Sequence, residues 1–256
     1  MIDSISIASS GLSAQQDVID SISNNLANIN TNSYKKNIVN FESLVYQPAA
    51  SADSLIDLTA RKGGGISSSS IEREFSIGDI KQTGKTLDIA INGDGFIELI
   101  DENGNTVYTR NGSLKINTDS FLTSQDGLLL SAMISIPEET ESLVITDKGL
   151  VMAVFDGGVE SQEIGQIEIV TFTNPSALEP LNGQNYKATE QSGHSQYADL
   201  ESSSTSIAQG YLEMSNVNMI EELTAMMLAQ QAYGLNSRVV QTSDEIMGMI
   251  NNLTQG

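Results

Sequence analysis

Asp101, Asn103 and Asn105 alternate along the chain in the way that oxygen ligands open a calcium-binding loop. Such a loop also needs a glycine at its sixth position and a bidentate glutamate at its twelfth. Here those two positions hold Thr106 and Gly112. The run therefore predicts a hairpin turn and not a calcium site.

Other residues that could carry out chemistry are isolated or missing. The single histidine, His194, stands in a Ser-Gly-His-Ser run that is typical of a solvated loop. The chain has no cysteine, which excludes disulfides, thiolate metal sites and cysteine nucleophiles. Gly93-Asp94-Gly95 lacks the Gly-Lys-Ser/Thr that completes a phosphate-binding loop. We predict no catalytic, metal-binding or cofactor-binding residue, and hence no enzyme.

The charge balance narrows the possible partners. The 256 residues include 33 Asp+Glu and 12 Lys+Arg, which gives a net charge of −21. Such a chain lacks the basic surface that nucleic acids and anionic membranes require. Residues 1–20 contain acids and no base, unlike a secretory signal, and no apolar run approaches the roughly 20 residues of a membrane span. We expect no cleaved leader and no membrane insertion.

The elements at the two chain ends must form any functional surface. Near the N-terminus, apolar residues recur every three or four positions, with one glutamine among them. This spacing predicts a helix with a heptad seam, beside which Gly11 would let a partner backbone come close. The seam consists of Ile5, Ala8, Leu12, Gln15, Ile19, Ile22, Leu26 and Ile29.

The C-terminal segment repeats this pattern. Asn218, with Glu221 three residues later, resembles a capping box that starts a helix. Methionine is frequent in this segment, which suits a surface that must adapt its packing. The apolar positions at helical spacing are Leu223, Met226, Met227, Tyr233, Val240, Met247, Ile250 and Leu253.

The remaining faces of the N-terminal helix are polar but poor in charge. Ser, Asn, Gln or Thr occupies 16 of the first 34 positions, where an exposed helix would carry Lys and Glu. Charge-poor faces are typical of surfaces buried against other protein. An ordinary intramolecular helix pair that closes a single domain is the alternative. Helices with few charge pairs are marginal in isolation, so we expect both ends to be mobile before assembly.

Between the helices the pattern changes to alternation. Leu87, Ile89 and Ile91 alternate with Asp88 and Ala90. Seven Asn-Gly or Asp-Gly pairs between positions 92 and 183 favour tight turns between strands. The predicted fold class is α+β, in which N- and C-terminal helices pair as a coiled coil and the central domain is mainly antiparallel β.

These patterns divide the chain into four segments. Residues 1–46 form the N-terminal helix and the segment after it, and residues 211–256 include the C-terminal helix that packs with it. Residues 71–210 form the β-rich domain. The Gly- and Ser-rich residues 47–70 are expected to be a linker or an irregular extension.

Four motifs resemble those of bacterial flagellar rod and hook proteins. They are Ser10-Gly11-Leu12 with residues 24–35, the runs 91–96 and 108–113, and residues 215–218 with the Glu-Glu-Leu that follows. Members of this family often have Gly-Phe where the chain has Ser33-Tyr34, and a second Phe where it has Ile97. The residues that match the family signature are Gly11, Asn24, Asn25, Leu26, Asn28, Asn30, Thr31, Asn216 and Asn218.

The resemblance implies a structural protein without cofactors. Family members are exported unfolded through the flagellar type III apparatus and polymerise helically into the shaft that transmits torque from motor to hook. Their terminal helices line the tube, so the apolar helix positions named above would form the assembly interface. The implied partners are further copies, proximal rod and hook proteins, the bushing rings around the rod, and the export apparatus. The implied location is the basal-body rod that crosses the periplasm.

Several alternatives stay open at this point. The length, residues 47–70 and the Ser-Asn-Val-Asn start of the last helix are most similar to distal rod members, with proximal rod or hook-type members as alternatives. A different class is a secreted β-domain binding protein whose helices form a dimerisation stalk. A third class is a hydrolase with paired carboxylates, although no pair among the 33 acids stands out.

Overall fold

The computed structural model describes residues 2–46, 62–101, 103–155, 161–182, 184–198 and 205–254. The chain divides into two compact units. Unit 1 comprises residues 1–27, 37–73 and 218–256, and unit 2 comprises residues 28–36 and 74–217. The chain therefore passes between the units four times, after residues 27, 36, 73 and 217.

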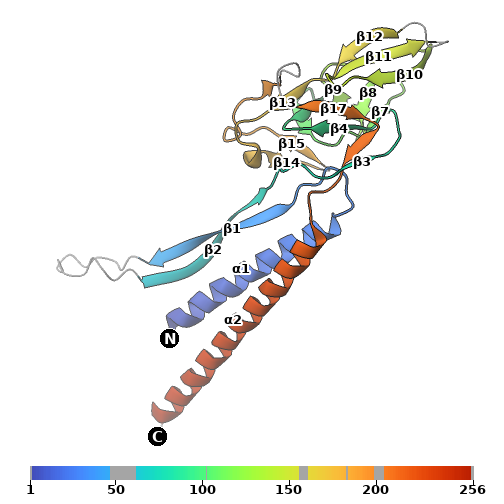
Figure 1. The fold of residues 1–256 in the computed structure, drawn as a ribbon. Coiled ribbons are helices and arrows are strands. Elements are labelled where there is room, and N and C mark those ends of the chain that lie inside the picture. The colour runs from blue at the N-terminus through green and yellow to red at the C-terminus, as the bar shows by residue number, and fades with distance from the viewer. Residues whose placement is uncertain are drawn as a thin grey trace. The chain divides into compact units, whose positions relative to one another are not determined.

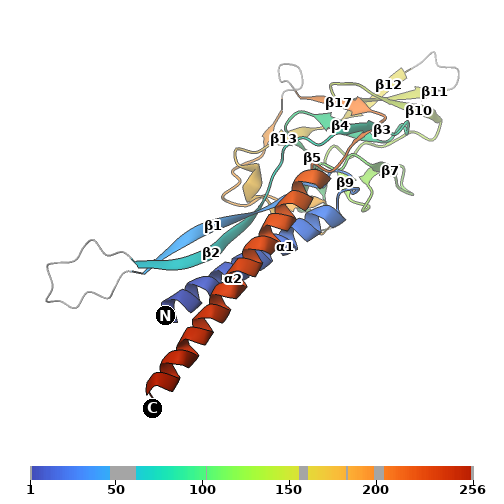
Figure 2. The same cartoon turned by 60° about the horizontal axis from the view of Figure 1, so that its bottom comes forward.

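Unit 1 consists of two helices and a hairpin. α1 (Ile2–Ala27) and α2 (Met219–Thr254) pack side by side in opposite directions, so the two chain ends lie at the same end of the pair (Figure 1). β1 (Asn37–Tyr46) and β2 (Lys62–Arg73) form an antiparallel hairpin that lies along α1 (Figure 2). α2 has 36 residues against 26 in α1 and extends past the N-terminal end of α1.

The expected linker over residues 47–70 differs from the structure, because residues from 62 onward belong to strand β2. Its glycines allow strand pairing instead of preventing it. The pairing skips the residue between Gly63 and Gly65, which forms a bulge. A Cβ on Gly65 would lie 2.3 Å from Ser10 Oγ, so glycine lets the strand approach α1 closely. Residues 47–61 lie outside the described residues.

Unit 2 is an antiparallel β domain. Its elements are β3 (Ile80–Gln82), β4 (Ile89–Asn92), β5 (Phe96–Ile100), β6 (Thr106–Thr109), β7 (Leu114–Ile116), β8 (Leu122–Ser124), β9 (Leu129–Leu130), β10 (Thr140–Ile145), β11 (Leu150–Phe155), β12 (Ser161–Gln166), β13 (Ile169–Thr171), the 3₁₀ turn η1 (Pro175–Ala177), β14 (Glu179–Pro180), β15 (Asn185–Lys187), β16 (Gln196–Tyr197), β17 (Ser206–Gln209) and β18 (Tyr211–Glu213).

The strands pair so that the end of the domain returns to its beginning. One sheet has the order β14-β15-β6-β5-β9-β8-β7, with β13 paired to β5 and β16 paired to β13. Another has the order β10-β11-β12. The late strands β17 and β18 pair with the early strands β4 and β3. The predicted antiparallel β domain between terminal helices is therefore confirmed.

Alternating apolar residues build most of the core of unit 2. In β11, Val151 and Ala153 are buried while Met152 is half-buried, as a strand with one buried face requires. At the start of β4 the predicted alternation fails, because Asp88 and Ala90 are buried together with Ile89 and Ile91. A second cluster packs Phe75, Phe96, Tyr108, Phe172 and Tyr186 edge to face, with ring centroids 4.8–6.0 Å apart.

The Asn-Gly and Asp-Gly pairs have two different uses. Asn103-Gly104 joins β5 to β6 and Asp126-Gly127 joins β8 to β9, as predicted. Gly112 instead allows a close approach, because a Cβ there would lie 1.8 Å from the carbonyl oxygen of Ile89.

Replacing Gly112 by Ala should lower the free energy of unfolding by about 2–4 kcal/mol. The new methyl group would push against Ile89, whose amide also donates to the Gly112 carbonyl at 2.9 Å. Gly104→Ala is the control, because it has a φ of 79° but no atom within 4 Å of the added Cβ. It should cost about 1 kcal/mol. Urea unfolding followed by circular dichroism measures both, and equal losses would contradict the close packing at Gly112.

Candidate assembly interface

Two contacts set the register between α1 and α2. Asn25 Nδ2 donates to Glu222 Oε2 at 3.2 Å. Gly11 lies against Asn236, whose Nδ2 would be 2.8 Å from a Cβ at position 11. The two contacts are the same distance apart along both helices, about four turns, so one face of each helix meets the other over this length.

The predicted positions on α2 divide between two environments. Met226, Val240 and Met247 are half-buried and share the three-four spacing of Glu222 and Asn236, which contact α1. The other predicted side chains are mainly exposed, and that of Leu253 lies outside the described residues. The exposed ones are Leu223, Met227, Tyr233 and Ile250.

The predicted seam on α1 lies beside the two contacts described above between α1 and α2. Those contacts fall on Gly11 and Asn25, next to the predicted Leu12 and Leu26. Of the predicted apolar seam, Ala8 and Ile22 are buried and the others are half-buried: Ile5, Leu12, Ile19, Leu26 and Ile29.

The helical seam also ends earlier than predicted. α1 stops at Ala27, so Ile29 lies in the turn that follows and belongs to unit 2. There the Thr31 amide donates to the Asn28 carbonyl at 3.0 Å. Asparagines favour such turns because their side chains compete with helical hydrogen bonds.

Some polar residues of α1 are covered by the β1–β2 hairpin. Ser10 Oγ accepts from the Ile66 amide at 3.2 Å. Asp17 accepts from Ser68 Oγ at 2.8 Å. Asn25 is buried and exchanges two hydrogen bonds with the Asn37 backbone. Part of the charge-poor surface of α1 is therefore covered within the same chain.

α2 carries a second apolar row, of which only Ile246 was predicted, as an extension of the apolar helix face. Its members are 39–76% exposed. They recur at helical spacing away from the residues that contact α1, so the pattern could have been found in the sequence as a second apolar stripe. We call this row the outward face, and it consists of Ile220, Leu228, Leu235, Val239 and Ile246.

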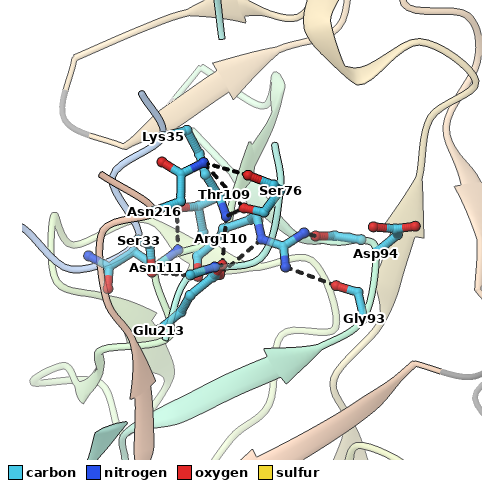
Figure 3. Close-up of polar contacts among 12 residues, drawn as sticks. Ser33, Lys35, Ser76, Gly93, Asp94, Thr109, Arg110, Asn111, Glu213 and Asn216 are labelled. Atoms are coloured by element: carbon cyan, nitrogen blue, oxygen red, sulfur yellow. Dashed lines mark hydrogen bonds and ion pairs between the residues drawn. The ribbon is translucent and has the colours of Figure 1, made fainter. Parts of the chain in front are cut away.

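In unit 2, two cations share one buried carboxylate (Figure 3). Glu213 Oε1 accepts from Lys35 Nζ at 2.6 Å, and Glu213 Oε2 accepts from Arg110 Nε at 3.0 Å. The three side chains are at most 1% exposed. Burial is the main cause that lowers the pKa of Lys35, while the charge of Glu213 opposes this shift. The cluster was not predicted from the sequence, since charged residues are usually exposed.

The glycine-rich run 91–96 forms a cradle for Arg110. The Nη1 of Arg110 donates to the Gly95 carbonyl at 3.1 Å, and the Nη2 of Arg110 donates to the Gly93 carbonyl at 2.9 Å. The guanidinium carbon also lies 5.9 Å from the ring centre of Phe96. Two of the motifs recognised in the sequence thus form one binding arrangement.

Ser33 adopts a backbone conformation that favours glycine. Its φ is 55°, in the left-handed region, and its side chain is buried. Ser33 Oγ donates to the Arg110 carbonyl at 3.0 Å, and its amide donates to the Glu213 carbonyl at 2.8 Å. These bonds hold a serine in a backbone conformation that favours glycine.

The described residues offer little to catalysis. They contain no group of three His, Asp or Glu placed to hold a metal ion, and His194 is exposed. A pocket of about 650 Å³ is lined by Asp101 and Asp126, among other residues. Asp126 is exposed and accepts from Asn185 at 3.0 Å, so the pocket lacks the desolvated pair that a glycosidase uses. None of the helices described is long and apolar enough to cross a bilayer.

Three segments match known families. Residues 5–35 match "Flagella basal body rod protein", residues 90–153 match "Flagellar hook protein FlgE/F/G D1 domain", and residues 208–253 match "Flagellar basal body rod FlgEFG protein C-terminal". The flagellar basal-body rod protein FlgG of Borreliella burgdorferi is 38% identical over 99% of both chains. Those of Bacillus subtilis and Caulobacter vibrioides are 36% and 34% identical over 96–99% of each chain. This chain belongs to the FlgG-type flagellar basal-body rod protein family.

The family assignment makes the chain a structural subunit of the flagellar rod. The ion cluster takes one residue from each matched segment: Lys35, Arg110 and Glu213. The family signatures at the two chain ends and in the β domain therefore meet in one buried arrangement.

Replacing Glu213 by Gln should lower the free energy of unfolding of this rod protein by about 3–5 kcal/mol, because two buried cations lose their counter-charge. Glu74→Gln removes the same charge from a partly exposed pair with Lys36 and should cost less than about 1 kcal/mol. Urea unfolding distinguishes them. Equal losses in the free energy of unfolding would show that the buried cluster stabilises the protein no more than the Lys36–Glu74 pair does.

A disulfide between positions 11 and 236 should form readily in the Gly11→Cys/Asn236→Cys variant, because the chain has no other cysteine and these positions touch. The Gly11→Cys/Arg238→Cys variant is the control, since Arg238 is exposed and lies on another face of α2. Mass spectrometry after mild oxidation of the monomer measures the yield. A higher yield in the control would contradict the observed register.

Proposed function

We propose that this subunit polymerises helically into the distal rod and there transmits torque from motor to hook. The observation that carries the proposal is the outward face of α2, whose large apolar side chains are exposed in the single chain. An apolar row of this length is typical of a surface that another protein covers. Head-to-tail contacts through such a face propagate as an open helix when the rotation does not close.

The contact between the helices supports coiled-coil packing of α1 and α2. Their contacts recur at matching intervals along both helices, and the half-buried α2 positions keep three-four spacing. One face of α2 is then used within the chain, and the outward face is available to a second copy. The predicted interface residues on the α1-facing side stabilise the subunit, while the exposed ones contact neighbours.

The partners follow from this assembly. They are further copies of the chain, the proximal rod and hook proteins at the two ends of the rod, and the bushing rings around it. The subunit reaches the periplasm through the flagellar type III apparatus. The surplus of acidic residues keeps the unassembled chain soluble.

Leu235→Glu should prevent polymerisation while leaving the monomer folded. The side chain is 61% exposed, so the substitution should change monomer stability by no more than about 0.5 kcal/mol. In a packed interface the same carboxylate would be buried without a partner. Gln241→Glu, at another exposed position of α2, is the control. Seeded assembly followed by sedimentation, and swimming of cells that carry each variant, measure the effect.

Normal rods and swimming in the Leu235→Glu variant would contradict the role of the outward face. Seeded assembly of the wild-type chain is a second test of the proposal. Monomers that give rods when seeded support a shaft subunit, whereas a closed dimer at every concentration would support a dimerisation stalk instead.

A further inference from the structure

Three segments of unit 2 are bonded to one another around Glu213. We call residues 33–36, 74–79 and 213–216 together the clamp. The first and third segments are joined by two backbone hydrogen bonds, from the Ser33 amide to the Glu213 carbonyl at 2.8 Å and from the Asn216 amide to the Tyr34 carbonyl at 3.3 Å. The Lys35 ammonium adds an ion pair to the Glu213 carboxylate.

The second segment is bonded to both of the others. Toward the first segment, the Glu74 amide donates to the Lys36 carbonyl at 3.0 Å, and Lys35 Nζ donates to the Ser76 carbonyl at 2.6 Å. Toward the third segment, the Gly78 amide donates to Glu213 Oε1 at 2.9 Å. A Cβ on Gly78 would lie 2.2 Å from the Met214 carbonyl oxygen, so the two backbones are in direct contact.

The side chain of Asn216 bridges all three segments. Its Oδ1 accepts from the Lys36 amide at 2.8 Å. Its Nδ2 donates to the Glu74 carbonyl at 2.8 Å and to Ser76 Oγ at 3.0 Å. An amide is the side chain that can accept from one backbone and donate to another at the same time. This explains in physical terms why an asparagine occupies that position of the signature.

The clamp occupies the places where the chain enters and leaves unit 2. The chain leaves after residue 36, returns after residue 73 and leaves again after residue 217, and each of these points adjoins a clamp segment. The first entry, after residue 27, leads to Ser33 through a short turn. Arg110 fixes the clamp to the end of β6 through Glu213 and Ser33.

We propose that the clamp makes these entry and exit segments move as one body, and that Asn216 and Glu213 are the positioning residues that distribute load among them. The inference rests on the proposed role in torque transmission. Force that enters through a single segment breaks its hydrogen bonds one after another, whereas cross-bonded segments share the force. A shaft subunit with two units needs this sharing, because these segments adjoin the crossings of the chain between the units after residues 36, 73 and 217.

Hydrogen exchange of the full-length monomer tests the coupling directly. Asn216→Ala removes the bridge at a half-buried position and should speed exchange about tenfold in all three clamp segments together. The sheet β10-β11-β12 should keep its protection. Asn105→Ala, in an exposed turn, is the control and should leave the clamp unchanged. Faster exchange confined to residues 213–217 would overturn the proposal, and so would loss of protection throughout unit 2.

The Asn216→Asp substitution distinguishes a coupled clamp from a set of independent hydrogen bonds. The carboxylate still accepts from the Lys36 amide but faces the Glu74 carbonyl without a hydrogen to donate. Independent bonds predict faster exchange in residues 74–79 alone. The clamp predicts faster exchange in all three segments, and the first result would overturn it.

Rod stiffness tests the mechanical part. Rods assembled from the Asn216→Ala chain should form normally but bend several times more easily than wild-type or Asn105→Ala rods in electron micrographs. Variant rods as stiff as the wild type would overturn the load-sharing role. A wild-type chain that forms no rods would contradict the proposed function instead, and the exchange experiment would still decide whether the clamp couples its segments.

Discussion

The sharing of one buried carboxylate between two cations constrains the whole of unit 2. Glu213 is 1% exposed and cannot be solvated, so it needs both the Lys35 ammonium and the Arg110 guanidinium in place. Lys35 lies near the N-terminus, Arg110 in the middle of the chain and Glu213 near the C-terminus. The β domain can therefore close only when residues from before β1 and from β18 have reached the same place. Such a cluster adds little net stability compared with apolar packing, but it strongly disfavours alternative arrangements of these segments.

The two units differ in how far their surfaces are covered within the chain. Unit 2 is held by its apolar core and by the ion cluster. In unit 1, α1 is covered on one side by α2 and on another by the hairpin, which uses the serines and asparagines of α1 as hydrogen-bond partners. The side chains of the outward face of α2 are exposed. Among the described residues of unit 1, the exposed large apolar side chains are therefore concentrated on α2.

The sequence predicts the type of each large element well, because hydrophobic spacing records helices and strands directly. It predicts details less well where polar or small residues decide them. The glycines of β2 indicate a linker by composition, yet they allow a bulged strand to approach Ser10. Asn28 ends α1 before the seam is complete.

The ion cluster shows a limit of a different kind. Lys35, Arg110 and Glu213 lie far apart in the sequence, and no periodicity connects them. The motifs around Arg110 and Lys35 resemble family signatures, but this resemblance does not indicate that both cations pair with one carboxylate. Only the pairing of β18 with β3 brings Glu213 to this position.

The outward face of α2 is exposed in the single subunit, and in the proposed rod a neighbouring copy covers it. Footprinting with a reactive carbene on the wild-type protein, before and after assembly, measures this directly. We expect strong labelling of Leu228 and Val239 in the monomer and loss of that labelling in the rod, with the core residue Leu99 unlabelled in both. Equal labelling of Leu228 and Val239 in the two states would contradict it.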